Sequence, residues 1–179
     1  MHDDAVVVLP VHRWTAEDGL SKTTDGIALE RTLEIAASGT VVARLQCLPR
    51  DVGDLAAGFL LANGLADSSA DIGEISVTED GSRVDVEGKG LDSATAAGMG
   101  EKMALASGCG KALFAPQVAG RFKRASGETK AFSAAQIQRA VKDLSKRGEV
   151  FELTGAVHAA AAWREGECIA YCEDLARHN

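Results

Sequence analysis

The sequence is poor in aromatic residues and in proline, and it lacks a long apolar run. Aromatic residues make up 4% of the 179 residues, and three prolines stand against 19 glycines. This composition predicts many loops around a small core. No stretch approaches the roughly 18 consecutive apolar residues that a membrane-spanning helix needs. The opening residues, MHDDAVVVLPVHRW, lack the basic start and apolar centre of a secretory signal. Insertion into a membrane and export are therefore not expected.

Basic residues are in deficit and cysteines are few. The formal net charge of −7 disfavours binding to nucleic acid or to an anionic membrane, because phosphate groups attract basic surfaces. The four cysteines, Cys47, Cys109, Cys168 and Cys172, are too sparse for a secreted disulfide scaffold. We therefore expect a cytoplasmic protein whose thiols are reduced. The apolar fraction of 46% is typical of a globular chain.

Hydrophobic periodicity predicts an α+β fold that starts with a hairpin and a helix. Apolar residues nearly alternate over residues 27–35, a Ser38-Gly39 turn signal follows, and residues 41–47 have β-type composition. A helix should come next, with Asp51 as its cap and Gly64 as its left-handed C-terminal residue. Its apolar face is expected to pack on the hairpin. This face consists of Val52, Leu55, Ala56, Phe59 and Leu60.

Two further hairpins and one further helix are expected. The first hairpin pairs residues 74–77 with 83–88 through an Asp80-Gly81 turn, and the second pairs 156–163 with 167–172. Between them, residues 88–131 are rich in glycine and predict a functional loop or a mobile connector.

The clearest helix signal covers residues 133–147. Ser133 and Gln136 form a capping box, and Phe132 and Ile137 are spaced for a hydrophobic staple. Apolar residues recur at helical spacing and predict a buried stripe, and Gly148 should end the helix. The predicted stripe consists of Ile137, Val141 and Leu144.

Cys109 is the cysteine best suited to chemistry. Gly108 and Gly110 flank it, so that little side-chain cover surrounds the thiol and its backbone is unrestricted. Positive charge on Lys102, Lys111 and Arg121 would favour the thiolate, which is the nucleophilic form of cysteine. The alternative interpretation is a small buried hydrophobic residue, because free cysteine is commonly buried.

A metal site is the alternative use of the remaining thiols. Cys168 and Cys172, with His158 and His178, contain suitable ligand types, but their spacing is not that of a zinc motif. Side chains alternate along a strand, so two cysteines four residues apart should lie on the same face and pack there. We therefore predict no metal site, and we expect Cys47 to be structural.

Two polar groups near the C-terminus stay open to either interpretation. His158 lies in an apolar segment and could be a hydrogen-bonded core residue or a site residue. Arg177, His178 and Asn179 combine groups that suit phosphate or carboxylate, although a chain end with this composition is also commonly solvated.

Four segments resemble the FdhD family, and they follow one another along this chain in the same order as in the family. ELTGAVHAAAAW is similar to the family's T-G-G-V-H-A-A-A stretch, with Ala156 in place of the second glycine. CEDLARHN resembles E-D-V-G-R-H-N, with Leu175 and Ala176 substituted. LPRDVGDLAAGFLLANGL resembles the family's T-P-G-D-x-x-x-L-A-x-G-F-L-x-x-E-G segment. SGCGKA stands where the family keeps a reactive cysteine loop, often C-x-x-C, and here Ala106 occupies the first cysteine position.

This resemblance implies a sulfur carrier of the sulfurtransferase type. FdhD proteins accept persulfide sulfur from a cysteine desulfurase and pass it to the bis-pterin guanine dinucleotide cofactor of molybdenum or tungsten. The cofactor is a client on its way to formate dehydrogenase, and no permanently bound cofactor is implied. Cys109 would carry the persulfide. The residues implied for the nearby cofactor-binding site are Thr154, Gly155, His158, Glu173, Asp174, Arg177 and His178.

The resemblance also implies domain boundaries and a homodimer. Residues 1–95 would form an N-terminal α+β subdomain, residues 96–132 the glycine-rich loop that carries Cys109, and residues 133–179 the first part of a domain similar to cytidine deaminase. The family continues after R-H-N, so we expect a C-terminal third to be missing and the last hairpin to self-associate. Two alternatives remain: a half-protein that docks cofactor or dehydrogenase without relaying sulfur, and a metal-binding hydrolase fragment that uses His158 and the cysteines.

Overall fold

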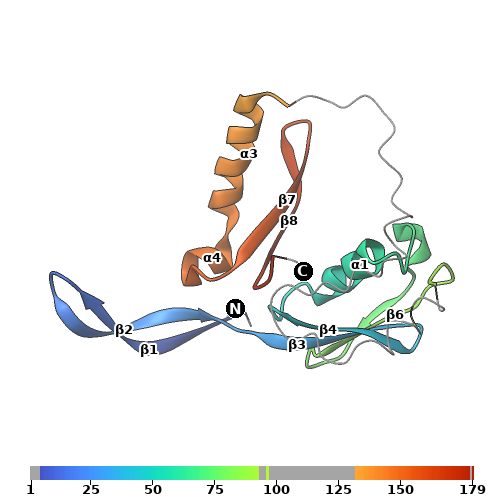
Figure 1. Ribbon diagram of the computed structural model, residues 1–179, viewed down its shortest axis with the longest axis horizontal. Coiled ribbons are helices and arrows are strands. Elements are labelled where there is room, and N and C mark those ends of the chain that lie inside the picture. Colours follow the sequence, from blue (N-terminus) through green and yellow to red (C-terminus); the bar gives the residue numbers. More distant parts are fainter. Residues whose placement is uncertain (1–4, 93–95, 97–131, 178) are drawn as a thin grey trace. The chain divides into compact units, whose positions relative to one another are not determined.

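The computed structural model describes residues 5–92, 96, 132–177 and 179 and confirms the α+β fold (Figure 1). The chain divides into two compact units. The first consists of Met1–Glu30 and Phe132–Arg177, and the second of Arg31–Ala131 and His178–Asn179. This division differs from the predicted domains, because the first 30 residues group with the C-terminal segment. Among the described residues, no helix is long and apolar enough to span a membrane.

The second unit is built on a four-stranded sheet with the order β4-β3-β6-β5. The strands β3 (Arg31–Ala37) and β4 (Thr40–Cys47) form the first predicted hairpin, and β5 (Ile75–Val77) and β6 (Arg83–Val86) form the second. β6 lies parallel to β3, so the two hairpins share one sheet. Apolar side chains on one face of this sheet form the core of the unit.

The helix α1 (Val52–Ala62) covers the apolar face of this sheet (Figure 1). Ala56 and Leu60 are fully buried, and the other three residues of the predicted face are partly buried against the same core. The predicted Asp51 cap is wrong, because Asp51 adopts a left-handed conformation and makes no side-chain capping bond. Gly64 has a φ of 67° as expected, and the short 3-10 helix η1 (Ser69–Asp71) follows.

The first unit begins with a long hairpin that the sequence did not predict. β1 (Val6–Thr15) and β2 (Gly19–Ala28) pair in unbroken register from Val6 opposite Ala28 to Thr15 opposite Gly19. Its large apolar side chains do not alternate toward a core: Trp14 and Leu20, a cross-strand pair, are each 69% exposed. A two-stranded ribbon with exposed faces lacks the periodicity that identifies a half-buried strand.

The helix α3 (Ala134–Arg147) starts as predicted but is not buried as predicted. The Oγ of Ser133 accepts a hydrogen bond from the backbone N–H of Gln136, and the Gln136 side chain caps the Ser133 N–H in return. The predicted buried stripe is wrong: Val141 is 57% exposed, Ile137 and Phe132 are also exposed, and no α3 residue is buried. Within the described residues the helix packs on β7 of the narrow β7–β8 hairpin, and much of its apolar face stays exposed.

The unit ends with a short helix and the third predicted hairpin. α4 (Glu149–Thr154) is followed by β7 (His158–Arg164) and β8 (Glu167–Asp174), which pair antiparallel. Glu165 and Gly166 have φ values of 54° and 91°, the two positive angles of a type I′ turn. In Figure 1 the hairpin runs alongside α3. The helix α4, which was not predicted, packs on the β1–β2 hairpin.

Candidate functional site

The residues implied for a cofactor-binding site fall in one part of the first unit. Six of the seven lie on α4, directly after α4, on the β7–β8 hairpin or directly after this hairpin. They are Thr154, Gly155, His158, Glu173, Asp174 and Arg177. Cys109, the predicted sulfur carrier, and His178 lie outside the described residues.

Thr154 and Gly155 shape the corner between α4 and β7. The hydroxyl of Thr154 donates to the Val150 carbonyl at 2.7 Å and accepts a bond from the Ala156 N–H at 3.2 Å. Gly155 ends α4 with a φ of 63°, and its N–H donates to the Phe151 carbonyl at 2.7 Å. A positive φ strains residues that carry a Cβ, so the local backbone favours glycine at this position. Both residues therefore direct the chain from α4 into β7.

His158 and Asp174 are direct cross-strand neighbours at the open end of the β7–β8 hairpin. Residues opposite each other in an antiparallel pair project from the same face, with Cβ atoms about 5 Å apart. His158 is exposed, whereas Asp174 is half-buried and its Oδ1 accepts a bond from the Leu175 N–H at 2.7 Å. Arg177, three residues beyond, is exposed. The open end of the hairpin thus carries an imidazole on β7 and a carboxylate on β8, and a guanidinium follows three residues after that carboxylate.

Glu173 differs from these residues because it is buried and engaged by the backbone. Only 9% of the residue is exposed. Its two carboxylate oxygens accept hydrogen bonds from the N–H groups of Val150 at 3.0 Å and Phe151 at 2.9 Å. These N–H groups belong to the first turn of α4, where no intrahelical acceptor exists. Glu173 therefore caps α4 from the neighbouring strand.

Sequence comparison identifies the family of this chain. The sequence model of the FdhD/NarQ family matches residues 28–179. The chain belongs to the FdhD/NarQ family. The match includes the α4–β7 corner and the β8 end described above, and it begins at the last residue of β2, so that most of the N-terminal hairpin precedes it.

Several curated FdhD proteins resemble this chain. A sulfur carrier protein FdhD from Anaeromyxobacter sp. (strain K) is 34% identical over 172 residues, which cover 87% of this chain and 58% of the relative. One from Mycobacterium tuberculosis (strain ATCC 25618 / H37Rv) is 32% identical over 186 residues, covering 93% and 66%. The chain thus spans about three fifths of the length of these relatives.

A solved structure shares the fold. The crystal structure of a protein from Desulfotalea psychrophila, described provisionally as a formate dehydrogenase accessory protein, superposes with a TM-score of 0.76. The match covers 97% of this chain and 65% of the other at 20% sequence identity. At this identity the likeness establishes the FdhD-type fold.

The described cysteines of this FdhD-family chain do not form a metal site. Cys168 pairs with Trp163 and Cys172 pairs with Ala160, because the register shifts between Ala162 and Trp163. The expected placement of both thiols on one face is therefore wrong: the bulge turns Cys168 toward the Trp163 face and Cys172 toward the opposite one. Cys47 is buried at the end of β4, as expected of a structural thiol. Over the described ranges, no three His, Cys, Asp or Glu residues form a group that could hold a metal ion.

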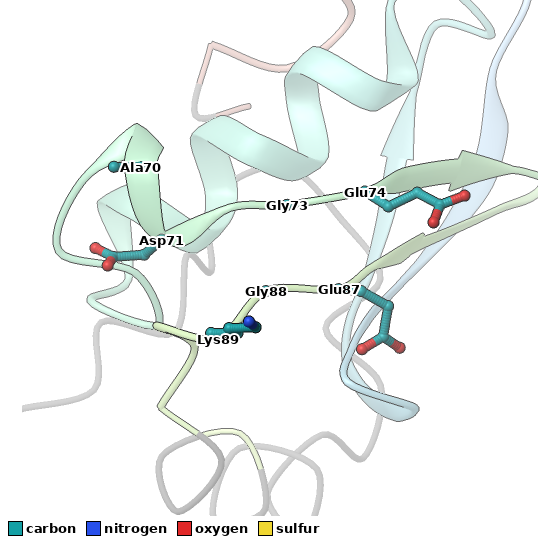
Figure 2. A pocket seen from close by; sticks show the side chains of 7 residues that line it. All are labelled: Ala70, Asp71, Gly73, Glu74, Glu87, Gly88 and Lys89. Atoms are coloured by element: carbon teal, nitrogen blue, oxygen red, sulfur yellow. The ribbon is translucent and has the colours of Figure 1, made fainter.

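The second unit contains a surface hollow that the sequence did not indicate. It has a volume of about 540 Å³ and is lined by Ala70, Asp71, Gly73, Glu74, Glu87, Gly88 and Lys89 (Figure 2). The Asp71 carboxylate is already bonded to the backbone N–H groups of Asp67 and Ser68 and to the Ser68 hydroxyl. Three carboxylates against one lysine disfavour an anionic ligand. The hollow contains none of the residues implied for the FdhD site.

Proposed function

We propose that this chain carries sulfur for the maturation of formate dehydrogenase. The observation that supports this proposal is membership of the FdhD/NarQ family over residues 28–179, together with relatives that are named sulfur carrier protein FdhD. The α4–β7–β8 corner lies inside the matched range and contains six of the seven residues that the family motifs imply.

In the proposed reaction Cys109 is the persulfide carrier. Its thiolate attacks the outer sulfur of a persulfide on a cysteine desulfurase, so that a new S–S bond forms at Cys109. The bond to the donor cysteine breaks, and that cysteine leaves as a thiolate. No electrons are gained or lost overall, because the sulfane sulfur keeps its oxidation state. One thiol is sufficient for this exchange, so the alanine at position 106 does not prevent it.

The proposed client is the bis-pterin guanine dinucleotide cofactor of molybdenum or tungsten. Its pyrophosphate groups need cationic or N–H donors. Two exposed side chains of this part of the unit could supply them: the imidazole of His158 and the guanidinium of Arg177, which follows three residues after Asp174, the cross-strand neighbour of His158. Thr154 and Gly155 would shape the backbone there, and we include Asp174 and His178 in the proposed site. These residues fit a phosphate-bearing ligand, whereas the oxygens of Glu173 are already bonded to backbone N–H groups.

The proposed partners are a cysteine desulfurase and formate dehydrogenase in the cytoplasm, with the chain as a homodimer. The uncovered face of the β7–β8 hairpin supports self-association. Ala160, Ala162, Ala170 and Cys172 project from this face and are all exposed. Such an apolar surface is commonly covered in an assembled protein.

Persulfide labelling tests the proposal. The full chain is incubated with a desulfurase and cysteine, and mass spectrometry locates any added sulfur. We expect the sulfur on Cys109 and its loss in Cys109→Ala. Cys168→Ala and Cys172→Ala are matched controls that should keep the label. A label on Cys168 or Cys172, or no label at all, would contradict sulfur carriage by Cys109. An unlabelled chain that still binds the guanine dinucleotide cofactor would favour the alternative function of a non-catalytic binding paralogue.

A further inference from the structure

We infer that Glu173 is a positioning residue: it holds α4, and through α4 the segment from Thr154 to His158, and it does not contact the client cofactor. The family resemblance placed Glu173 among the cofactor-binding residues. The structure instead engages both of its carboxylate oxygens in hydrogen bonds to Val150 and Phe151.

The helix α4 is too short to be stable by itself. It has six residues, far fewer than the dozen or more that an isolated helix needs in water. Its own N-terminal residue Gly148 provides no side-chain cap. The carboxylate of Glu173 therefore supplies the acceptors that the first turn lacks, and it does so with the charge that a helix N-terminus favours.

The carboxylate of Glu173 is closely surrounded by the chain. A Cβ added at Gly148 would lie 3.2 Å from Oε1 of Glu173 and 3.0 Å from Cβ of Phe151. A side chain at this position would therefore press on the Glu173 carboxylate and on Phe151, which shows how closely the chain surrounds the carboxylate. Buried, enclosed and bonded twice, Glu173 has little freedom to turn toward a ligand.

The opposite end of α4 packs against the N-terminal hairpin. A Cβ added at Gly26 of β2 would lie 2.4 Å from the Leu153 carbonyl oxygen, a distance that real contacts do not reach. With a rise of about 1.5 Å per residue, the six-residue helix is only about 9 Å long. A displacement at either end therefore shifts the whole helix and the Thr154-Gly155 corner that follows it.

The strand β8 connects α4 to β7. Glu173 and Asp174 are adjacent on β8, and they pair with Ala159 and His158 on β7. One strand thus fixes His158 through the ladder and α4 through the Glu173 carboxylate. The segment from Thr154 to His158 is held at both ends, and loss of the carboxylate would release one of them.

The test compares Glu173→Gln, Gly26→Ala and the double variant in the full chain. Glu167→Gln, at an exposed glutamate on the same strand, is the matched control. Glutamine keeps one acceptor oxygen but turns an NH₂ toward a backbone donor, so one bond is lost. We expect hydrogen exchange at the Val150 and Phe151 N–H groups to accelerate about tenfold. The control should leave these rates unchanged.

Binding of guanosine diphosphate, a probe for the nucleotide half of the cofactor, gives the second measurement. Part of the inference rests on the proposed function, and only this arm depends on it. We expect Glu173→Gln and Gly26→Ala each to raise the Kd. The double variant should raise it by less than the product of the two factors, because both changes release the same helix. A direct cofactor contact would instead leave Gly26→Ala without effect, or make the two factors multiply.

The two arms separate the possible failures. If hydrogen exchange at the Val150 and Phe151 N–H groups is unchanged in Glu173→Gln, the inference is wrong regardless of the nucleotide-binding result. Accelerated exchange in a chain whose wild type does not bind the nucleotide would support the positioning role and count against the proposed client. Exchange over β7 and β8 reports whether the first unit remains folded, and exchange over β3 and β4 reports the same for the other unit. If Glu173→Gln unfolds the first unit, the nucleotide affinity of Gly26→Ala decides between the two roles.

Discussion

Leu60→Ala should remove a large part of the stability of the second unit. Leu60 is 0% exposed and packs with Leu33, Ile35 and Val84 between α1 and the sheet. Truncation of such a leucine costs the transfer free energy of the lost atoms and leaves a cavity, together about 3 kcal/mol. A domain of this size has a total stability of about 5–15 kcal/mol. With a urea m-value of about 1.5 kcal/mol per M, the midpoint should fall by about 2 M.

The choice of assay follows from the positions of the chromophores. The two tryptophans and the single tyrosine, at positions 14, 163 and 171, all belong to the first unit. Intrinsic fluorescence therefore does not report on α1 and its sheet. Far-UV circular dichroism in urea, with hydrogen exchange over β3 and β4, measures the loss directly.

Leu61→Ala is the matched control, since Leu61 is the next residue of the same helix and is only partly buried. Its truncation removes the same atoms from a site that already contacts water, so the loss of stability should be clearly smaller. Equal shifts of the urea midpoint for the two variants would refute the packing that we describe for α1.

Two further predictions concern local hydrogen bonds. Ser133→Ala should destabilise α3 by about 1 kcal/mol, seen as faster exchange at the Gln136 and Ile137 N–H groups, whereas Ser145→Ala on the same helix should have little effect there. Hydrogen bonds from the Ser82 N–H, from Thr78 and from the Ser82 hydroxyl lower the pKa of Asp80 from 3.8 to about 2. The depressed pKa means that this turn is stabilised above about pH 4 and loses that contribution as the pH falls through 2. An NMR titration of Asp80 with a midpoint near 3.8 would contradict this assignment.

Features that depend on near neighbours could be predicted from the sequence. The capping box at Ser133, the left-handed Gly64 and the Ser38-Gly39 turn are set by residues within a few positions of one another. Each was confirmed because the physical cause lies within the pattern itself. The Asp51 cap was not, because a suitable residue type does not fix the backbone conformation that capping requires.

Burial was harder to predict, because it depends on the partner surface. The apolar spacing of α3 is real, but its partner is a hairpin of two strands, and Ile137 and Val141 stay exposed. The reverse holds for the N-terminal hairpin, whose exposed Trp14 and Leu20 gave no sign of a strand. In both cases the missing information was the size of the surface that each element meets.

The candidate site shows the same limit at the level of single side chains. The motif letters were sufficient to select residues 173 and 174 together, but the two adjacent carboxylates have different environments. Strand alternation sends Glu173 to the face where α4 begins and Asp174 to the face of His158. Ile169 has no partner in the register of β7, and this β-bulge places Cys168 and Cys172 on opposite faces of the hairpin. A single bulge therefore decides which thiols and carboxylates can act together, and register of this kind comes from the pairing of strands, which the spacing of residues along one chain does not contain.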